Sequence, residues 1–282
     1  MSTIEIAGRR RIRWGTPFSY FIGLAIAAIA LGPVIYAILG GFRTTGQIAT
    51  NPAGLPHPWV LDNYKLVLTN SGFWIQVRNS VLIAGITTTL VVVLGVMAGF
   101  ALSRYEFKGR EGVYTFFTVG LFFPLTVAIL PLFILIRDMN LQDNPLGVAL
   151  PQAAFALPTT IIILRPFLRA LPTELEDAAM IDGCSRVGFF WRIALPLAKP
   201  GLVTVGVLAF VGSWNAYLLP LLILGKTDSY TLPLGTAAFS TQYTSNTAAI
   251  LAFTSLAMIP AMVFFLLAER QIVGGLAGAV KG

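Results

Sequence analysis

The chain has 282 residues, of which 56% are hydrophobic and only 11% are charged. A soluble domain carries about 25% charged residues, so most of this protein's surface faces something other than water. The net charge is +7, but the basic residues are not gathered into a patch that could follow a phosphate backbone, which argues against nucleic acid as a partner. With one cysteine and one histidine, the chain can form no internal disulfide and offers no Cys/His cluster for a metal ion.

Charge-free apolar stretches recur along the chain and predict six transmembrane helices. A bilayer core about 30 Å thick requires about 20 apolar residues at helical rise. The first stretch, 18–42, is longer than the apolar region of a signal peptide, so we expect an uncleaved span. The sixth lies within 229–268, and its apolar part begins near Ala248. The four spans between them are 80–103, 112–136, 144–164 and 200–225.

The distribution of lysine and arginine sets the expected orientation. With the N-terminus in the cytoplasm, fourteen of the nineteen basic residues lie on the inner side. The expected fold class is therefore an all-α, polytopic membrane protein with both termini in the cytoplasm. Its expected parts are an N-terminal arm (1–17), a six-span domain (18–268) whose loop 165–199 is cytoplasmic, and a cytoplasmic tail (269–282).

Prolines and small residues within the spans favour a kinked, closely packed bundle. Each proline removes a backbone hydrogen bond and tends to bend its helix. Gly95 and Gly99 form a GxxxG pattern, which predicts close packing of the second span against another helix of the bundle. The prolines inside the expected spans are Pro33, Pro124, Pro131, Pro151, Pro158, Pro220 and Pro260.

The spans contain no recognisable source of energy. No Asp, Glu, Lys or Arg lies in the middle of a span, whereas proton relays and most ion-coupled carriers need such groups at membrane depth. The tripeptide Gly225-Lys226-Thr227 looks like the end of a phosphate-binding loop, but that motif requires a glycine where Pro220 stands. The tripeptide also lies outside in the expected topology. If transport is active, another polypeptide must supply the energy.

The longest cytoplasmic loop, 165–199, carries the most specific local signals. Thr173 and Glu176 have the spacing of a capping box, which predicts the start of a helix. Gly183 is placed to end that helix after about two to three turns. A second helical segment with apolar Phe189, Phe190 and Ile193 is expected before the fifth span. From these residues alone, an amphipathic connector on the membrane surface is as good an interpretation as a docking site.

This loop resembles the EAA motif of the membrane subunits of bacterial ABC importers, in which Glu-Ala-Ala precedes Asp-Gly and later Phe and Leu-Pro. The corresponding residues are Asp177-Ala178-Ala179, Asp182-Gly183, Phe190 and Leu195-Pro196. The sequence departs from the motif at Asp177, where Glu is usual, and at Cys184, where Ala is usual. The resemblance implies that a partner ATPase is coupled through Glu174, Glu176, Asp177, Ala178, Ala179, Asp182, Gly183 and Phe190.

The resemblance extends along nearly the whole chain. Ser213-Trp214-Asn215, Leu232-Pro233 and the C-terminal tail look like carbohydrate-uptake permeases of the type represented by the smaller permease of the maltose system. This implies a type I ABC importer permease in the bacterial cytoplasmic membrane, surrounded by lipid, without catalytic residues or a bound cofactor. The implied partners are a second permease, two ATPase subunits that hold ATP and Mg, and an extracytoplasmic sugar-binding protein. The tail residues expected at the ATPase interface are Gly278, Ala279, Val280, Lys281 and Gly282.

A sugar pathway needs polar groups for hydroxyls and flat apolar faces for C–H surfaces. Trp214, Asn215 and Tyr217 in the fifth span fit this requirement, with Gln152 and Thr126 as further candidates. The alternative is that Trp214 and Tyr217 only pack and Asn215 bonds another helix. His57 and Cys184 are interpreted as an ordinary loop residue and a small packing residue.

Two other functions remain open from the sequence. A self-sufficient facilitator or secondary carrier transports without an ATPase, and uptake by the purified chain alone distinguishes it. An ABC importer of the same architecture could instead carry glycerol phosphate or another polyol. An anionic cargo favours cations in the pathway, and the expected spans contain none.

Overall fold

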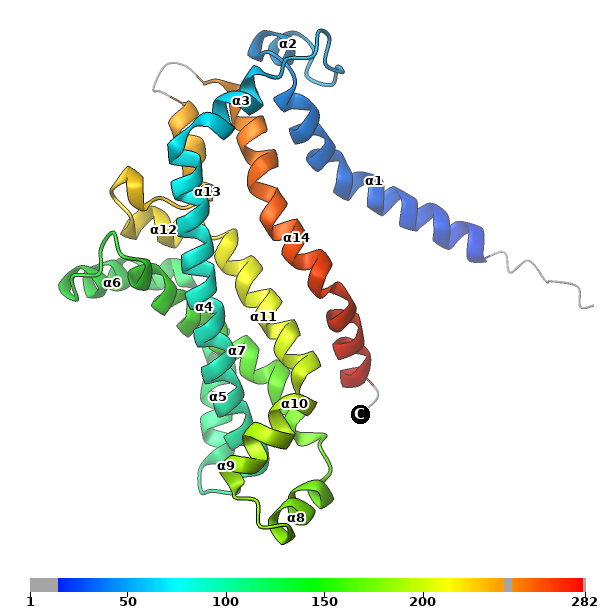
Figure 1. Ribbon diagram of the computed structural model, residues 1–282, viewed down its shortest axis with the longest axis vertical. Coiled ribbons are helices and arrows are strands. Elements are labelled where there is room, and N and C mark those ends of the chain that lie inside the picture. The colour runs from blue at the N-terminus through cyan, green and yellow to red at the C-terminus, as the bar shows by residue number, and fades with distance from the viewer. Residues whose placement is uncertain (1–14, 241–244, 281–282) are drawn as a thin grey trace, which may run out of the picture. The chain divides into compact units, whose positions relative to one another are not determined.

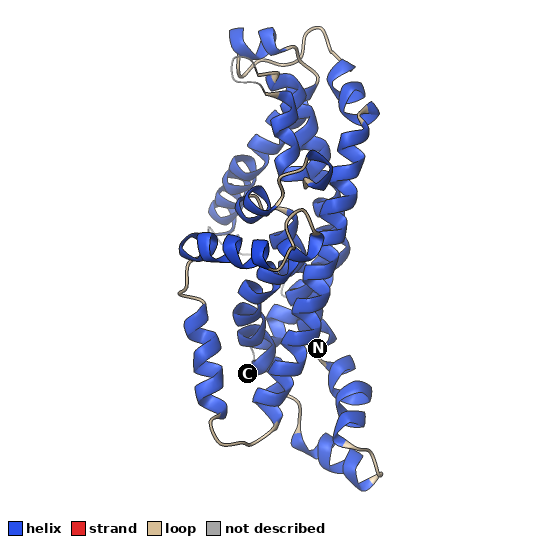
Figure 2. Ribbon diagram, turned by 90° about the vertical axis from the view of Figure 1, so that its left-hand side faces the viewer, coloured by secondary structure: helices blue, strands red, loops and turns tan. Residues whose placement is uncertain are grey.

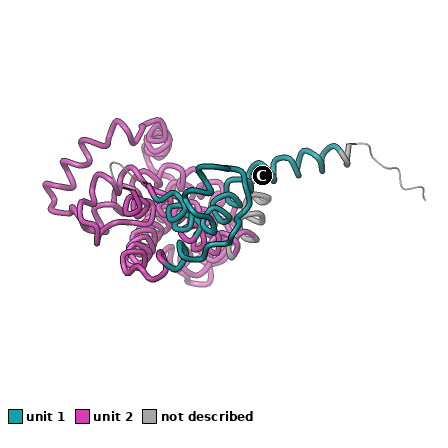
Figure 3. The backbone as a smooth tube through the Cα atoms, turned by 90° about the horizontal axis from the view of Figure 1, so that it is seen from above, with its two compact units in different colours: residues 1–65, 246–255 teal, residues 66–245, 256–282 magenta. Residues whose placement is uncertain are grey.

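A computed structural model describes residues 15–240 and 245–280, and most of these residues are helical. Within the described ranges the only β-type contact outside helices is a bridge between Ser240 and Ser245, and Figure 2 shows helices joined by loops. The chain divides into two compact units, which Figure 3 distinguishes by colour: residues 1–65 with 246–255, and residues 66–245 with 256–282.

Unit 1 contains one long apolar helix and the polar segment that follows it. In that segment Arg43 is only 2% exposed, and its guanidinium donates to the carbonyl oxygens of Gln47, Asn51 and Pro52. These bonds occupy both Nη groups of the cation and fix the turn after the long helix, while the buried Nε has no hydrogen-bond partner among the described residues. The helical elements of unit 1 are α1 (Gly15–Gly41), α2 (Thr45–Thr50), the start of α3 (Asp62–Thr69) and the start of α14 (Thr247–Val280).

Unit 2 contains the remaining described elements, which Figure 1 labels in chain order. Its long helices are α4 (Ser71–Arg104), α7 (Pro145–Arg169), α11 (Lys199–Trp214) and the rest of α14. Its shorter helices are α5 (Arg110–Gly120), α6 (Leu125–Asp138), α8 (Thr173–Ile181), α9 (Arg186–Phe189), a π-helical turn (Phe190–Ala194), α10 (Leu195–Leu197), α12 (Leu218–Ile223) and α13 (Leu232–Gly235).

Helix α4 packs along both α7 and α11, and this packing forms the core of unit 2 (Figure 1). The close approach depends on the two glycines of the GxxxG pattern. A Cβ atom at Gly95 would collide with the side chain of Thr160 on α7, and one at Gly99 would lie 3.3 Å from Leu168 Cδ1. The prediction that this pattern serves packing within the bundle is therefore confirmed.

The apolar helices agree with the predicted all-α, membrane-spanning fold. Four helices are long and apolar enough to cross a membrane, and two bent helix pairs raise the number to six if each pair is one span. The four single helices are 18–41, Ser71–Arg104, Pro145–Arg169 and 247–266. The second span thus begins nine residues earlier than the predicted 80–103, since α4 starts at Ser71.

The prediction of a continuous third span over 112–136 is wrong. Helices α5 and α6 meet at an angle of 98° across residues 121–124. Pro124 stands before α6 with φ −75° and ψ 132°, an extended conformation. Because proline donates no hydrogen bond and disfavours helical geometry in the residue before it, α5 ends here and α6 starts in a new direction.

The predicted fifth span over 200–225 is also interrupted. Helix α11 ends at Trp214, and the short α12 begins at Leu218. Pro220 cannot donate to the carbonyl of Ala216, and its ring would clash with that carbonyl in a continuous helix. Before α11, the segment Arg186–Leu197 meets it at 74°, so the structure adds a helical arm before the expected start of this span.

Candidate functional site

Helix α8 lies in the loop singled out by the sequence, but it does not start with a capping box. Pro172 occupies the N-cap position, and no side-chain capping bond is made. Thr173 is the first helical residue, and Glu176 forms an ion pair with Arg104 instead of reaching back to the helix start. The predicted capping box is therefore wrong, although the predicted helix is present. Glu174 and Glu176 still lie in the first turn, where the helix dipole favours negative charge.

The end of α8 is as predicted, at a glycine. Gly183 has φ +79°, a conformation that residues with a Cβ rarely adopt. Its N–H donates to Met180 O at 3.0 Å, and the N–H of Cys184 donates to Ala179 O at 2.8 Å. These two bonds form a Schellman motif, which satisfies the last carbonyls of the helix and turns the chain sharply.

The two sides of α8 have different environments. On the inner side Glu176 is partly buried and Ala179 is 6% exposed, while Phe190 (8% exposed) lies in the core below. The outer side presents a mixed acidic and apolar surface, in which Ile181 is 86% exposed. The predicted coupling residues on this outer surface are Glu174, Asp177, Ala178, Asp182 and Gly183.

The prediction missed Ile181, although its spacing could have revealed it. Ile181 follows Asp177 and Ala178 by four and three residues, so the three share one face of the helix. An exposed isoleucine beside acidic groups gives the outer surface of α8 an apolar centre.

Helix α8 and the helical arm Arg186–Leu197 rest on a buried apolar cluster. Phe100 of α4 lies 4.9 Å from Phe190 and 6.4 Å from Phe189, between ring centroids. Leu164 and Leu168 of α7 belong to the same cluster and are fully buried. This cluster joins α4, α7, α8 and α9 at one end of unit 2.

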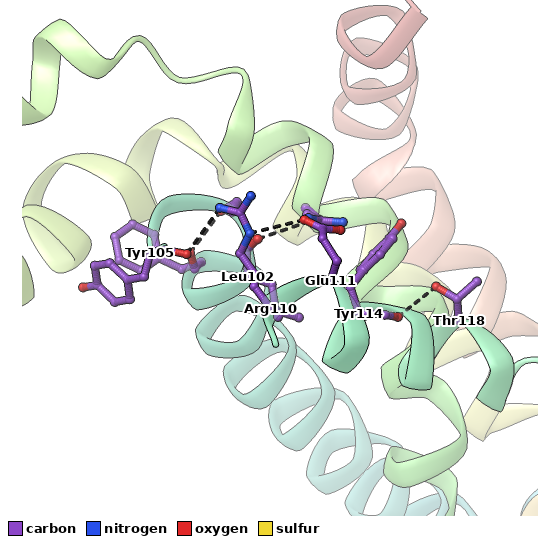
Figure 4. Close-up of polar contacts among 9 residues, drawn as sticks. Leu102, Tyr105, Arg110, Glu111, Tyr114 and Thr118 are labelled. Atoms are coloured by element: carbon purple, nitrogen blue, oxygen red, sulfur yellow. Dashed lines mark hydrogen bonds and ion pairs between the residues drawn. The ribbon is translucent and has the colours of Figure 1, made fainter. Parts of the chain in front are cut away.

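Polar contacts at the same end involve Arg165 near the C-terminus of α7. Its Nε donates to Leu102 O at 3.2 Å, its Nη2 pairs with Glu111 of α5, and its guanidinium lies 3.9 Å from the centre of the Tyr114 ring. Figure 4 labels Leu102, Glu111 and Tyr114 of this group, together with Arg110, which is also bonded to Glu111 and to Tyr105 O. Sequence reasoning missed the contacts of Arg165, because Leu102 and Glu111 are 63 and 54 residues away from it along the chain.

A cavity of about 300 Å³ in unit 2 contains part of the predicted sugar pathway. Gln152 lines it, and its Oε1 accepts hydrogen bonds from Thr87 (3.1 Å) and Ser213 (2.5 Å). Tyr217 and Phe155 contribute aromatic faces. The cavity thus combines a small polar cluster with apolar walls. Thr87 and Ser213 were missed by the prediction, because hydroxyls are common in apolar helices and serve packing there.

Three other predicted pathway residues do not line this cavity. Trp214 is 3% exposed, and its Nε1 donates to Ala257 O of α14 at 3.2 Å, which is the packing role left open by the sequence. Asn215 is exposed at the C-terminal end of α11, and Thr126 is exposed in the first turn of α6.

The remaining candidates lie at the periphery or outside the described residues. His57 is exposed between α2 and α3, and its carbonyl accepts from Gln47 Nε2 at 2.7 Å. Gly278, Ala279 and Val280 form the last described backbone of α14, whose side chains there are not described. The tail residues Lys281 and Gly282 lie outside the described residues.

Comparisons with known proteins give consistent matches. The family described as "Binding-protein-dependent transport system inner membrane component" matches residues 91–273. The arabinooligosaccharides transport system permease protein of Halalkalibacterium halodurans is 36% identical over 93% of this chain and 95% of its own length. The trehalose transport system permease protein of Mycobacterium tuberculosis is 34% identical over 98% of this chain and 100% of its own length.

The fold also matches a solved structure. One chain of a bacterial ABC transporter involved in the import of the acidic polysaccharide alginate aligns with a TM-score of 0.78 and 21% identity. The alignment covers 95% of this chain and 100% of that chain. The architecture is therefore that of an ABC importer permease.

Proposed function

Since the chain belongs to the family of binding-protein-dependent transport system inner membrane components, we propose that it is the sugar-specific permease subunit of an ATP-driven importer. Its relatives named for arabinooligosaccharide and trehalose transport support a sugar or oligosaccharide as the cargo. The chain is a transport subunit, and the ATP and Mg are held by a separate ATPase. The bacterial cytoplasmic membrane is its location, with both termini in the cytoplasm.

The outer surface of α8 is the part of the chain that docks on the ATPase. This assignment depends mainly on one observation: a short helix with a fixed end presents Ile181, Ala178 and acidic groups to solvent on a buried apolar platform. Ile181 supplies apolar area, and Glu174, Asp177 and Asp182 supply charge. Glu176, Ala179 and Phe190 support the helix from below. The C-terminal tail, Gly278 to Gly282, contacts the same ATPase.

The cavity beside Gln152 and Tyr217 forms part of the sugar pathway. Its amide and hydroxyl groups match the hydroxyls of a sugar, and its aromatic walls match the C–H faces. A second, related permease completes the pathway, and an extracytoplasmic binding protein delivers the sugar.

Transport by reconstituted proteins tests this function. We expect vesicles that contain both permeases, the ATPase and the binding protein to accumulate labelled trehalose or arabinooligosaccharide only when ATP is inside. Accumulation by this chain alone, without an ATPase, would show a self-sufficient facilitator and would contradict the proposal.

The docking surface is tested by a matched pair of substitutions. Ala178→Trp adds a large side chain at an exposed position of α8, so this chain should fold while copurification of the ATPase and uptake are lost. Ala170→Trp makes the same change at an exposed residue in the preceding turn, outside α8, and should leave both intact. Normal uptake with Ala178→Trp would remove α8 from the coupling path.

A further inference from the structure

Arg104 lies where α4 meets the loop that carries α8. It occupies the last turn of α4, and its side chain is only 4% exposed. Its Nε and Nη2 donate to the same oxygen of Glu176, at 3.0 and 2.7 Å, and its Nη1 donates to Leu171 O at 2.7 Å. One guanidinium therefore contacts both α8 and the turn that precedes it.

The same guanidinium also faces the segment after α8. Its central carbon lies 5.8 Å from the centre of the Phe189 ring, which is fully buried in the apolar cluster below α8. Arg104 thus contacts residues before, within and after α8. A buried cation with all these partners holds one geometry, because moving any partner leaves the charge unsatisfied in a region of low dielectric.

Leu102, two residues before Arg104 in α4, is hydrogen-bonded to a different helix. The carbonyl of Leu102 accepts from Arg165 of α7, and Arg165 pairs with Glu111 of α5 (Figure 4). The C-terminal end of α4 is consequently bonded to α8 through Arg104 and to α7 and α5 through Arg165. A displacement of α8 therefore has a contiguous, hydrogen-bonded route into three helices.

We propose that Arg104 is the positioning residue that fixes α8 to the end of α4, so that the two helices move as one rigid body when the ATPase closes. The proposal rests on the proposed docking of α8 on an ATPase. Along the chain, the long helices that flank α8 are α7 before it and α11 after it. The Arg104 contact adds α4, the helix that packs along both of them and lines the cavity through Thr87.

The chemistry of this contact requires arginine rather than lysine. The planar guanidinium donates from three nitrogens toward two acceptors, and it also presents a face to the Phe189 ring. A lysine ammonium keeps the charge, but from one nitrogen it cannot reach Glu176 and Leu171 O with the same geometry.

Distances between spin labels measure the rigid-body motion directly. The complete transporter is used, with Cys184→Ala to remove the one native cysteine. The labels are attached at Thr173→Cys, the exposed first residue of α8, and at Met97→Cys, an exposed position of α4. We expect the distance distribution to be narrow and unchanged between the nucleotide-free state and the state trapped with ATP and vanadate.

Substitutions at Arg104 should loosen this connection. In Arg104→Gln we expect the distribution to widen and to shift when nucleotide is added. The exchanged pair Arg104→Glu with Glu176→Arg should narrow the distribution relative to Arg104→Gln, because it restores the ion pair although the bond to Leu171 O is lost; a purely structural loss would not be reversed in this way. Lys108→Gln, which removes a charge from an exposed residue just beyond α4, is the control and should behave as wild type.

Three results would overturn the proposal. They are a shift of α8 relative to α4 in the wild type, a wild-type distribution in Arg104→Gln, and a distribution in the exchanged pair as wide as in Arg104→Gln. A failure of the proposed docking gives a different result. The ATPase would then copurify with Ala178→Trp, while Arg104→Gln would still widen the distribution of distances between residues 97 and 173 in the nucleotide-free state.

Discussion

At the scale of single residues, the structure assigns partners that the sequence pattern could not. Glu176 has the spacing of a capping residue for Thr173, yet it pairs with Arg104, which is 72 residues away along the chain. The local pattern fits either bond, and the tertiary one forms because Arg104 would otherwise be a buried, unpaired charge. Gly183 was predictable, since helix termination is a local property of the backbone.

The contact between Asp143 and the backbone of residues 225–226 should depend on pH. The Asp143 carboxylate, between α6 and α7, accepts from the backbone N–H groups of Lys226 (2.9 Å) and Gly225 (2.7 Å). The Lys226 bond is the main cause that holds the pKa of Asp143 below its ordinary value of 3.8. A lowered pKa in the folded state stabilises the fold above the unfolded pKa, and this stabilisation is lost as the pH falls through the folded pKa.

We therefore expect the segment 225–229 to become sensitive to an acid-active protease as the pH falls from 3.8 through the lowered pKa of Asp143. In Asp143→Asn the segment should be cleaved at every pH in this range, because the charge-assisted bonds are absent. Asp138→Asn is the matched control, since Asp138 is exposed and its one ion pair among the described residues is with the neighbouring Arg137. Equal protection in wild type and Asp143→Asn would contradict the assignment.

At the scale of helices, apolar length predicted four of the six expected spans as continuous helices, and proline predicted the bends poorly. Helix α7 is continuous through Pro151, Pro158 and Pro166, whereas the chain turns by 98° at Pro124. The sequence does not distinguish these cases, because neighbouring helices decide whether the freed carbonyls find new partners.

The contact between α4 and α7 gives a prediction at this scale. Gly95→Val places methyl groups against Thr160, so we expect the free energy of unfolding in detergent to fall by about 1–3 kcal/mol. Gly85→Val is the matched control in the same helix, because no atom lies within 4 Å of a Cβ there. If both variants have the same stability, α4 does not approach α7 as closely as described.

The end of α8 gives a second prediction for an element. A β-branched residue at φ +79° is strained by about 1–3 kcal/mol, whereas asparagine tolerates this region. Gly183→Val should therefore reduce uptake by the complete transporter, and Gly183→Asn should retain most of it. Equal uptake by the two variants would show that the geometry of this turn is unimportant for coupling.

At the scale of the whole molecule, the sequence contains the information for the class of protein but little about the cargo. Composition and long apolar stretches predict a membrane bundle, and the motif in the loop 165–199 resembles that of the family. The cargo is less accessible because the cavity is built from common residues such as Gln152 and Ser213, brought together from different helices. Their spacing in the sequence carries no signature of a sugar.

Labelling of Ile181→Cys in a Cys184→Ala background is a sharp test of the claim that an ATPase holds α8 on the cytoplasmic side. Residue 181 is 86% exposed in this chain, so it is open to a membrane-impermeant thiol reagent. We predict labelling in inside-out vesicles but not in right-side-out vesicles, and protection when the ATPase is bound. Labelling from the outer side, or labelling unaffected by the ATPase, would contradict the claim.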